Sequence, residues 1–285
     1  NIMFKKIQNH SGWIKSLLFI PLIFISEIFG ALMLILIGYD ISELSSISTI
    51  SESTLALQKF FSLSICLLLL WLFMKFIDKQ DFVDLGFQIK KRLNDFTLGI
   101  LIGFSIMFSA FLILLLLDEI TYEGYNINFN NIVISILLFT GVSIFEEVIF
   151  RGYMLKNLLE SFNPYFALFI SSIFFSLIHG SNPNVTILGL SNIFLAGIFL
   201  GASYVFTKNL WFPIALHFSW NFFQSMFGFR VSGMDFYSII DFNILENNSL
   251  NGGEFGFESS ILSLFIITVS TIFIWKHFKS SELKK

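Results

Sequence analysis

The sequence predicts an all-α integral membrane protein, built as a bundle of about eight transmembrane helices. The first observation is composition: of 285 residues, 55% are hydrophobic and only 13% are charged, with a mean hydropathy of +0.79, unlike a soluble domain. The second is a series of apolar runs close to the ~20 residues that a helix needs to cross a bilayer. The third is that these runs lack the strict alternation of a membrane β-barrel.

Each apolar run is assigned to one span. The predicted spans are residues 17–38, 60–77, 96–117, 132–155, 164–179, 185–206, 210–227 and 261–278. The first run follows basic residues as a signal peptide does, but it is too long for one and lacks a small-residue cleavage site, so we expect a retained helix. The connections are too short to fold alone, which predicts a single integral domain, 1–285.

The basic residues predict orientation, because cytoplasmic loops are enriched in Lys and Arg. A cytoplasmic N-terminus puts all but three of the 17 Lys and Arg inside: Lys5, Lys6, Lys15, Lys75, Lys79, Lys90, Lys91, Arg92, Lys156, Lys208, Lys276, Lys279, Lys284 and Lys285. Lys59 and Arg230 fall outside, and Arg151 lies within a span. Both termini are therefore predicted to be cytoplasmic. Abundant Ile, Asn, Lys and Phe suggest a multi-pass protein of a prokaryotic cell membrane.

Several function classes are excluded by composition. The single cysteine, Cys66, cannot form an intrachain disulfide. A net charge of −3 without a dense basic patch argues against nucleic acid as a partner. No glycine-rich phosphate loop follows a strand, so we expect no nucleotide. The lipid bilayer is the one partner that composition predicts.

Three charges interrupt the span 132–155: Glu146, Glu147 and Arg151. A charge at the centre of a membrane helix costs roughly 3 kcal/mol, so none of the three should face lipid. Glu147 and Arg151 are four residues apart and are predicted to form an ion pair that fixes the helix. Glu146 lies about 100° around the helix from Glu147 and needs a partner from another span.

Two later spans supply polar candidates. His179 ends the run "FFSLIHG", while His217 and Asn221, four apart, share one face of "HFSWN". Each histidine alone is equally compatible with a packing role. Together, Glu146 and His179 would activate a water, and His217 with Asn221 would stabilise the oxygen of a carbonyl under attack. This set predicts peptide hydrolysis without a nucleophilic side chain.

The stretches "EEVIFR", "FSLIH" and "HFSWN" resemble, in order and spacing, the E-E-x-x-x-R, F-x-x-x-H and H-x-x-x-N motifs of the CAAX protease and bacteriocin-processing (CPBP or Abi) family. The resemblance is carried by a core at about 132–221. The Ras-converting CAAX endopeptidase is a member of the same family. It implies an intramembrane glutamate endopeptidase with an active-site cavity. By match to the motifs, Glu146 is the general base, His179 its partner on the water, and His217 and Asn221 the oxyanion stabilisers. Glu147 and Arg151 would be supporting residues.

Other functions remain open. The chain is alternatively a non-catalytic membrane partner or a bacteriocin self-immunity protein of the same fold. A zinc-dependent hydrolase would use Glu146, His179 and His217 as ligands, although no H-E-x-x-H motif is present, and we favour no cofactor. A transporter explains intramembrane charge but not the three motifs. The expected substrate is a membrane-associated peptide or protein, without an expectation of prenylation.

Four further features give expectations of structure. Glu27 is expected to be a protonated or hydrogen-bonded packing residue rather than part of a cavity, and the loop 229–260 is as compatible with a connector as with a cap. Gly197 and Gly201 are spaced for close helix packing. If the fourth span ends at Leu155, Glu146 lies roughly 13 Å from the cytoplasmic surface. His179 lies roughly 22 Å from the start of its own span, so the two residues would be at different depths and could not face one another. Either a boundary is wrong or a segment dips into a cavity that opens from the cytoplasm.

Overall fold

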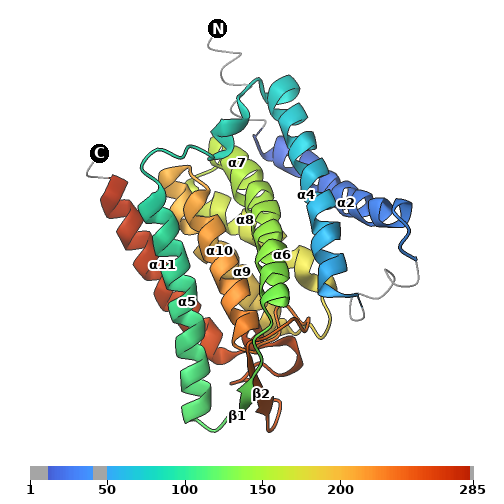
Figure 1. Ribbon diagram of the computed structural model, residues 1–285. Helices are drawn as coiled ribbons and strands as arrows, with labels where there is room; N and C mark the ends of the chain where they lie inside the picture. Colours follow the sequence, from blue (N-terminus) through green and yellow to red (C-terminus); the bar gives the residue numbers. More distant parts are fainter. Residues whose placement is uncertain (1–11, 41–49, 283–285) are drawn as a thin grey trace.

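The computed structural model describes residues 12–40 and 50–282 and is a bundle of tilted helices (Figure 1). The helices are α2 (Gly12–Leu36), α4 (Glu52–Leu72), α5 (Leu93–Leu116), α6 (Phe129–Glu147), α7 (Lys156–Ser161), α8 (Pro164–Ile178), α9 (Ile187–Thr207), α10 (Trp211–Met226) and α11 (Ile261–Glu282). Two π-helices, η1 (Phe73–Asp78) and η3 (Val148–Leu155), continue α4 and α6. Short 3-10 helices are η2 (Phe82–Leu85), η4 (His179–Ser181), η5 (Gly253–Phe255) and η6 (Phe257–Ser259). The helical membrane architecture is as predicted.

Seven helical segments of the described chain are long and apolar enough to cross a membrane. The remaining predicted span, 210–227, corresponds to α10, which has only 16 residues. Twelve of those residues are buried, because α10 packs against α5, α6 and α9. Large apolar side chains such as Leu18, Phe24 and Phe265 are exposed on the outside of the bundle, as a lipid-facing surface requires. The protein is a multi-pass membrane protein in which the short helix α10 is largely enclosed by its neighbours.

Helix α4 begins eight residues before the predicted start of its span at residue 60. Ser51 caps it, accepting a hydrogen bond from the Thr54 amide at 3.2 Å, a standard way to satisfy the free amides of a first turn. Lys59, predicted to lie in an outer loop, is therefore inside the helix. The prediction was wrong because hydropathy alone does not detect a polar first turn.

The fourth span also extends beyond its predicted end. Helix α6, the π-helix η3 and α7 are continuous from Phe129 to Ser161. Asn163 caps α8, and Pro164 occupies its first turn. Glu146 and His179 are then both 15 residues from the turn between α7 and α8. The depth mismatch thus came from the boundary placed at Leu155, which was wrong by six residues.

A small sheet was not predicted. Strand β1 (Ile120–Tyr125) pairs antiparallel with β2 (Ile240–Ile244), from Ile120 opposite Ile244 to Tyr125 opposite Ile240. The two strands are more than a hundred residues apart in the chain, so no local turn signal announces them. They lie at one end of the bundle, at the bottom of Figure 1.

Small residues allow two close helix contacts, as predicted. A Cβ atom added to Gly197 of α9 would lie 2.8 Å from the Cβ of Ser172 on α8, and one added to Gly201 would lie 2.5 Å from Leu168 Cδ1. Neither position has room for a side chain. The close approach of α8 and α9 brings the carbonyl of Gly197 within reach of the charged residues of α6 and η3.

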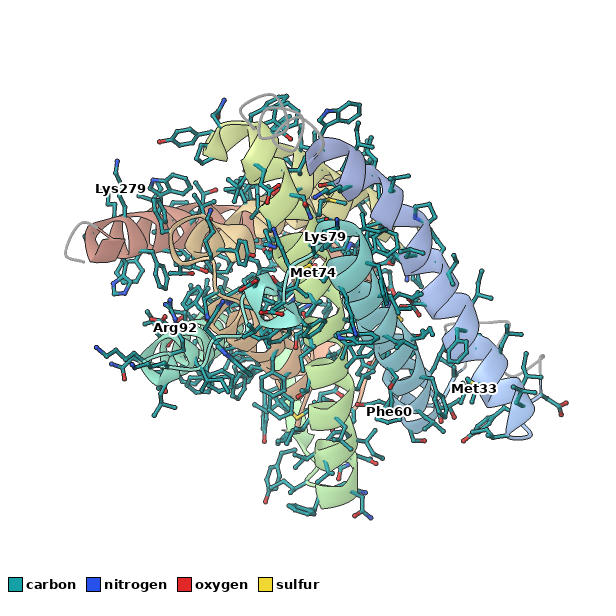
Figure 2. The ribbon with its side chains drawn as sticks, turned by 90° about the horizontal axis from the view of Figure 1, so that it is seen from above. Met33, Phe60, Met74, Lys79, Arg92 and Lys279 are labelled. Atoms are coloured by element: carbon teal, nitrogen blue, oxygen red, sulfur yellow. The ribbon has the colours of Figure 1, made fainter. Side chains whose placement is uncertain are left out.

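The two ends of the bundle differ in charge. The end opposite the sheet carries the loop 79–92 and the last turns of α11, with Lys79, Arg92 and Lys279 spread around it (Figures 1 and 2). The sheet end carries the acidic connections that contain Glu119, Glu123 and Asp241. Four of the lysines used to predict orientation, Lys5, Lys6, Lys284 and Lys285, lie outside the described residues.

Candidate functional site

The charged motif lies where α6 changes into a π-helix. Glu146 and Glu147 are the last residues of α6, and all eight residues of η3, including Arg151, are buried. π-Helical turns inside α-helices occur frequently at functional sites, because they redirect side chains that a regular helix would place elsewhere. The local structure therefore sets two adjacent carboxylates on different faces of one buried helix.

The predicted ion pair is present and fully buried. Arg151 Nη1 lies 2.7 Å from Glu147 Oε1, with side chains 1% and 0% exposed. Arg151 Nη2 donates to the Gly197 carbonyl at 3.1 Å, and the guanidinium carbon lies 4.4 Å from the ring centre of Phe175. Each contact replaces part of the hydration that the guanidinium loses on burial. The pair joins η3 to α8 and α9.

Glu147 has a second partner that sequence analysis missed. Its Oε1 also lies 2.8 Å from His217 Nδ1, which must donate because a carboxylate accepts. The sequence assigned Glu147 only to Arg151, because the residue that meets it from α10 is 70 positions away. The supporting carboxylate thus orients a candidate catalytic histidine, in the manner of a carboxylate–imidazole pair.

His179 is held by its own helix. Its Nδ1 lies 2.7 Å from the Phe175 carbonyl, so Nδ1 carries the proton and Nε2 is left free in the neutral ring. The Phe175 ring packs on both His179 and Arg151, at 4.8 Å between ring centres and 4.4 Å to the guanidinium. The phenylalanine of the F-x-x-x-H motif therefore has a physical role: it fixes the histidine and covers the arginine.

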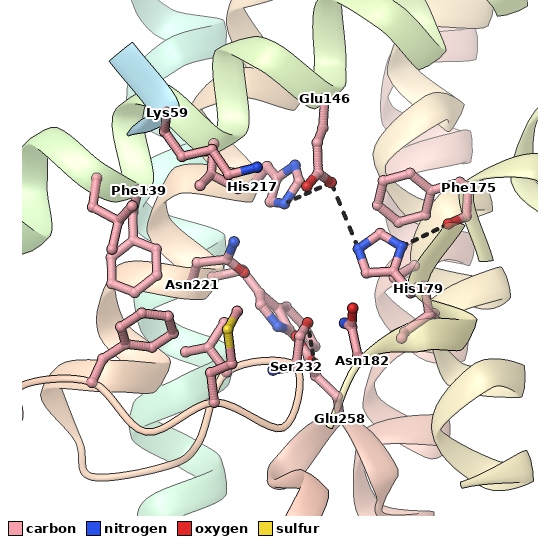
Figure 3. A pocket seen from close by; sticks show the side chains of 18 of the residues that line it. Lys59, Phe139, Glu146, Phe175, His179, Asn182, His217, Asn221, Ser232 and Glu258 are labelled. Carbon is pink, nitrogen blue, oxygen red and sulfur yellow. Dashed lines mark hydrogen bonds and ion pairs between the residues drawn. The ribbon is translucent and has the colours of Figure 1, made fainter. Parts of the chain in front are cut away.

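Glu146 faces both histidines. Its Oε2 lies 3.8 Å from His179 Nε2 and 3.9 Å from His217 Nε2 (Figure 3). Both distances are too long for direct hydrogen bonds and suit a bridging water. Oε2 has no hydrogen-bond partner among the described residues. The partner that the sequence required for Glu146 is thus supplied by α8 and α10 together.

These groups line one side of a cavity of about 430 Å³ within the bundle. Asn221 also lines it and is 7% exposed. Most of the remaining wall is apolar, from Leu138, Phe139, Val142, Phe175, Ile193, Phe199, Leu200, Trp220 and Ile267. All four predicted catalytic residues, Glu146, His179, His217 and Asn221, are therefore on the wall of a single cavity.

The cavity extends toward the sheet end of the bundle. Its wall there includes Val231, Ser232, Met234 and Glu258 from the loop between α10 and α11. This loop is a wall of the cavity and not merely a connector. The sequence predicted a cavity that opens at the basic end of the bundle. The lining residues do not indicate such an opening, because the basic loops contribute no residue to the cavity wall.

Glu27 and Lys59 form an ion pair on the same wall. Lys59 Nζ lies 2.6 Å from Glu27 Oε1, and both residues line the cavity. Glu27 is hydrogen-bonded, as expected, but it lines a cavity, which was not expected. Its cation comes from the neighbouring helix α4, and the sequence placed that lysine outside the membrane. Lys59, Glu258 and Asn192 are among the polar residues of the cavity wall whose role there the sequence did not reveal.

The carboxylate and the two histidines raise the question of zinc. Among residues 12–40 and 50–282, no three His, Cys, Asp or Glu side chains are arranged to hold a metal ion. The Nδ1 atoms of both histidines are engaged with oxygen acceptors, an arrangement that also occurs behind zinc-bound histidines. The same three residues are the ligands of the zinc-dependent alternative, which the assay described below tests.

The fold and the site together define the class of this protein: it is a multi-pass helical membrane protein with a cavity between its helices that is lined by charged residues. Residues 128–223 match the family model described as type II CAAX prenyl endopeptidase Rce1-like. Over this stretch, which is less than half of the chain, the protein is similar to that CAAX protease family. The match runs from the cap of α6 into α10 and contains all six motif residues, but not Glu27, Lys59 or Glu258. Comparison with curated proteins and with solved structures gives no match.

The buried pair predicts a large stability effect. Replacing Arg151 by Met should lower the free energy of unfolding by about 3 kcal/mol or more, because Glu147 is left as an uncompensated buried charge. The measurement is unfolding of the protein in mixed micelles by titration with a denaturing detergent. The control is Arg92→Met, whose pair with Asp95 is more exposed, at 19% and 21%, and should cost no more than about 1 kcal/mol. Equal effects of the two substitutions would contradict this account of the pair.

Proposed function

We propose that the protein is a membrane-embedded endopeptidase in which Glu146 activates a water. One observation carries the proposal: Glu146 Oε2 has no hydrogen-bond partner within residues 12–40 and 50–282, and it lies 3.8 and 3.9 Å from two histidine Nε2 atoms. A water between Glu146 and His179 fits these distances. The family supports a protease at the level of reaction class; the residue roles are our proposal.

The reaction balances with these groups alone. Glu146 accepts a proton from the water while the water oxygen attacks the carbonyl carbon of the scissile peptide bond. The oxyanion that forms accepts hydrogen bonds from Asn221 Nδ2 and from protonated His217. On collapse of the tetrahedral intermediate, the C–N bond breaks and the proton held by Glu146 passes to the leaving amine. His179 orients the water through Nε2.

Glu147 has an indirect role in this scheme. An imidazolium at His217 carries an N–H at both ring nitrogens. Glu147 accepts from Nδ1, which leaves Nε2–H for the oxyanion. The negative charge of Glu147 stabilises the positive ring as charge develops on the substrate. Glu147 and Arg151 are therefore positioning residues in this proposal.

The substrate is proposed to be a membrane-associated peptide or protein. The mostly apolar wall suits an extended apolar segment, and burial within the bundle limits access to chains that are already at the membrane. No cofactor is proposed, and zinc held by Glu146, His179 and His217 is the alternative that the test below decides.

The direct test uses purified protein in lipid nanodiscs and a library of internally quenched peptides. We expect cleavage by the wild type, and a loss of kcat of at least about 100-fold in Glu146→Gln and His179→Ala, since each removes general-base assistance. Glu160→Gln is the matched control, because Glu160 is exposed and does not line the cavity.

Three outcomes would reject parts of the proposal. Full activity of Glu146→Gln would exclude the assigned base. Activity lost to a chelator and restored by zinc would establish the zinc-dependent hydrolase. Absence of cleavage by the wild type, together with unchanged bacteriocin protection by cells carrying Glu146→Gln, would favour a non-catalytic immunity protein.

We further propose that the basic end of the bundle is cytoplasmic, in a prokaryotic cell membrane, with both termini on that side. The charge difference between the two ends supports this orientation. In a Cys66→Ser background, Lys90→Cys should resist a membrane-impermeant maleimide in intact cells, whereas Glu123→Cys should react. The opposite labelling pattern would show that the basic end faces away from the cytoplasm. In the proposed orientation, the loop side of the cavity faces away from the cytoplasm.

A further inference from the structure

The charges on the cavity wall do not balance. Glu27 is paired with Lys59 at 2.6 Å, and Glu146 faces two histidines. Glu258, on the loop before α11, also lines the cavity. Within the described part of the chain, no lysine or arginine pairs with it. One carboxylate of the cavity thus has neither a fixed cation nor a role in the proposed reaction.

The geometry of Glu258 leaves one oxygen available. Oε2 accepts the Ser232 amide N–H at 2.9 Å and the Ser232 hydroxyl at 2.9 Å. These bonds fix the side chain against the opposite arm of the loop, while Oε1 makes no hydrogen bond to any described residue. The residue is 9% exposed. Figure 3 places Glu258 and Ser232 at the end of the pocket away from Glu146.

Asn192 adds a second unsatisfied acceptor beside it. Its Nδ2 donates to the Glu258 and Ser260 carbonyls, both at 2.8 Å, which uses both amide protons. Its Oδ1 is buried without a partner among the described residues, and the residue lines the same cavity. This end of the cavity is therefore rich in acceptors and short of donors, whereas native buried polar groups are nearly always paired.

Burial acts on the charge of the carboxyl group. It raises the pKa of Glu258, opposed by the hydrogen bonds from Ser232 and by positive charge on His179 or His217. A cation bound at Oε1 would favour the ionised form by direct attraction. An ammonium or guanidinium group supplies that charge together with several N–H donors.

We infer that Glu258 and Asn192 form a subsite for a cationic N–H group of the substrate: a lysine or arginine side chain, or a free amino terminus. The inference rests on the proposed function, since it specifies the peptide that the cavity receives. The apolar wall takes the apolar part of the peptide, and the loop end takes its positive group. Glu258 is a specificity-determining residue in this account, separate from the groups that act on water.

The test compares binding of short fluorescent apolar peptides, all with acetylated amino termini, that differ at one position, which is lysine, its neutral isostere norleucine, or glutamate. The wild type in nanodiscs should bind a lysine peptide at least about 30-fold more tightly than the norleucine peptide, since an unpaired buried carboxylate is costly. Glu258→Gln should reduce this ratio below about threefold, and Glu258→Lys should shift the preference to the glutamate peptide. If Glu258 had a purely structural role, Glu258→Lys would not reverse the preference between the lysine and glutamate peptides.

Glu254→Gln is the matched control, because Glu254 lies four residues away in the same loop, is 56% exposed and pairs with Arg230 outside the cavity. It should keep the wild-type ratio. Equal binding of lysine and norleucine peptides by the wild type overturns the inference. This comparison uses the wild type alone, so it does not depend on whether a variant folds. Charge-selective binding without cleavage rejects the proposed function but supports the subsite. Cleavage without charge preference rejects the subsite alone.

Discussion

The carboxylate of Glu147 is the constraint on which the site depends. One oxygen, buried completely, accepts from Arg151 at 2.7 Å and from His217 at 2.8 Å. Through Arg151 the carboxylate reaches the Gly197 carbonyl of α9 and the Phe175 ring of α8. A charge that costs several kcal/mol to bury alone is tolerated because it joins four segments of the bundle. The direction of His217, and with it the cavity wall, follows from this contact.

Pairing also decides which groups are left to act. Glu147 is neutralised by Arg151 and Glu27 by Lys59, so Glu146 and Glu258 are the cavity carboxylates without a lysine or arginine partner among the described residues. Neighbouring residues in the sequence have thus acquired different tasks. Glu147 holds the structure, while Glu146, one position earlier on another face, is available to a water. Two histidines fixed through Nδ1 direct Nε2 toward the same point.

Much of this arrangement was predictable from the sequence. The spans follow from hydropathy, because a bilayer demands apolar length, and the Glu147–Arg151 contact follows from helical spacing. The contacts that the sequence did not predict depend on tertiary structure or on where helices begin and end. The polar first turn of α4 hid the Lys59–Glu27 pair, and the short helix α7, which continues η3 to Ser161, hid the true depth of Glu146. His217 meets Glu147 across 70 residues, and Glu258 reaches the cavity from a loop, where no periodic pattern applies.

The central claim is that Glu146 makes this protein a hydrolase of membrane-associated peptides. Comparative peptidomics of membranes tests it most directly, using cells that express the wild type and cells that express Glu146→Gln at equal levels. The account predicts peptides with new termini in the wild-type membranes, with their intact precursors accumulating in the variant. Identical sets of peptides in the two membranes would contradict it.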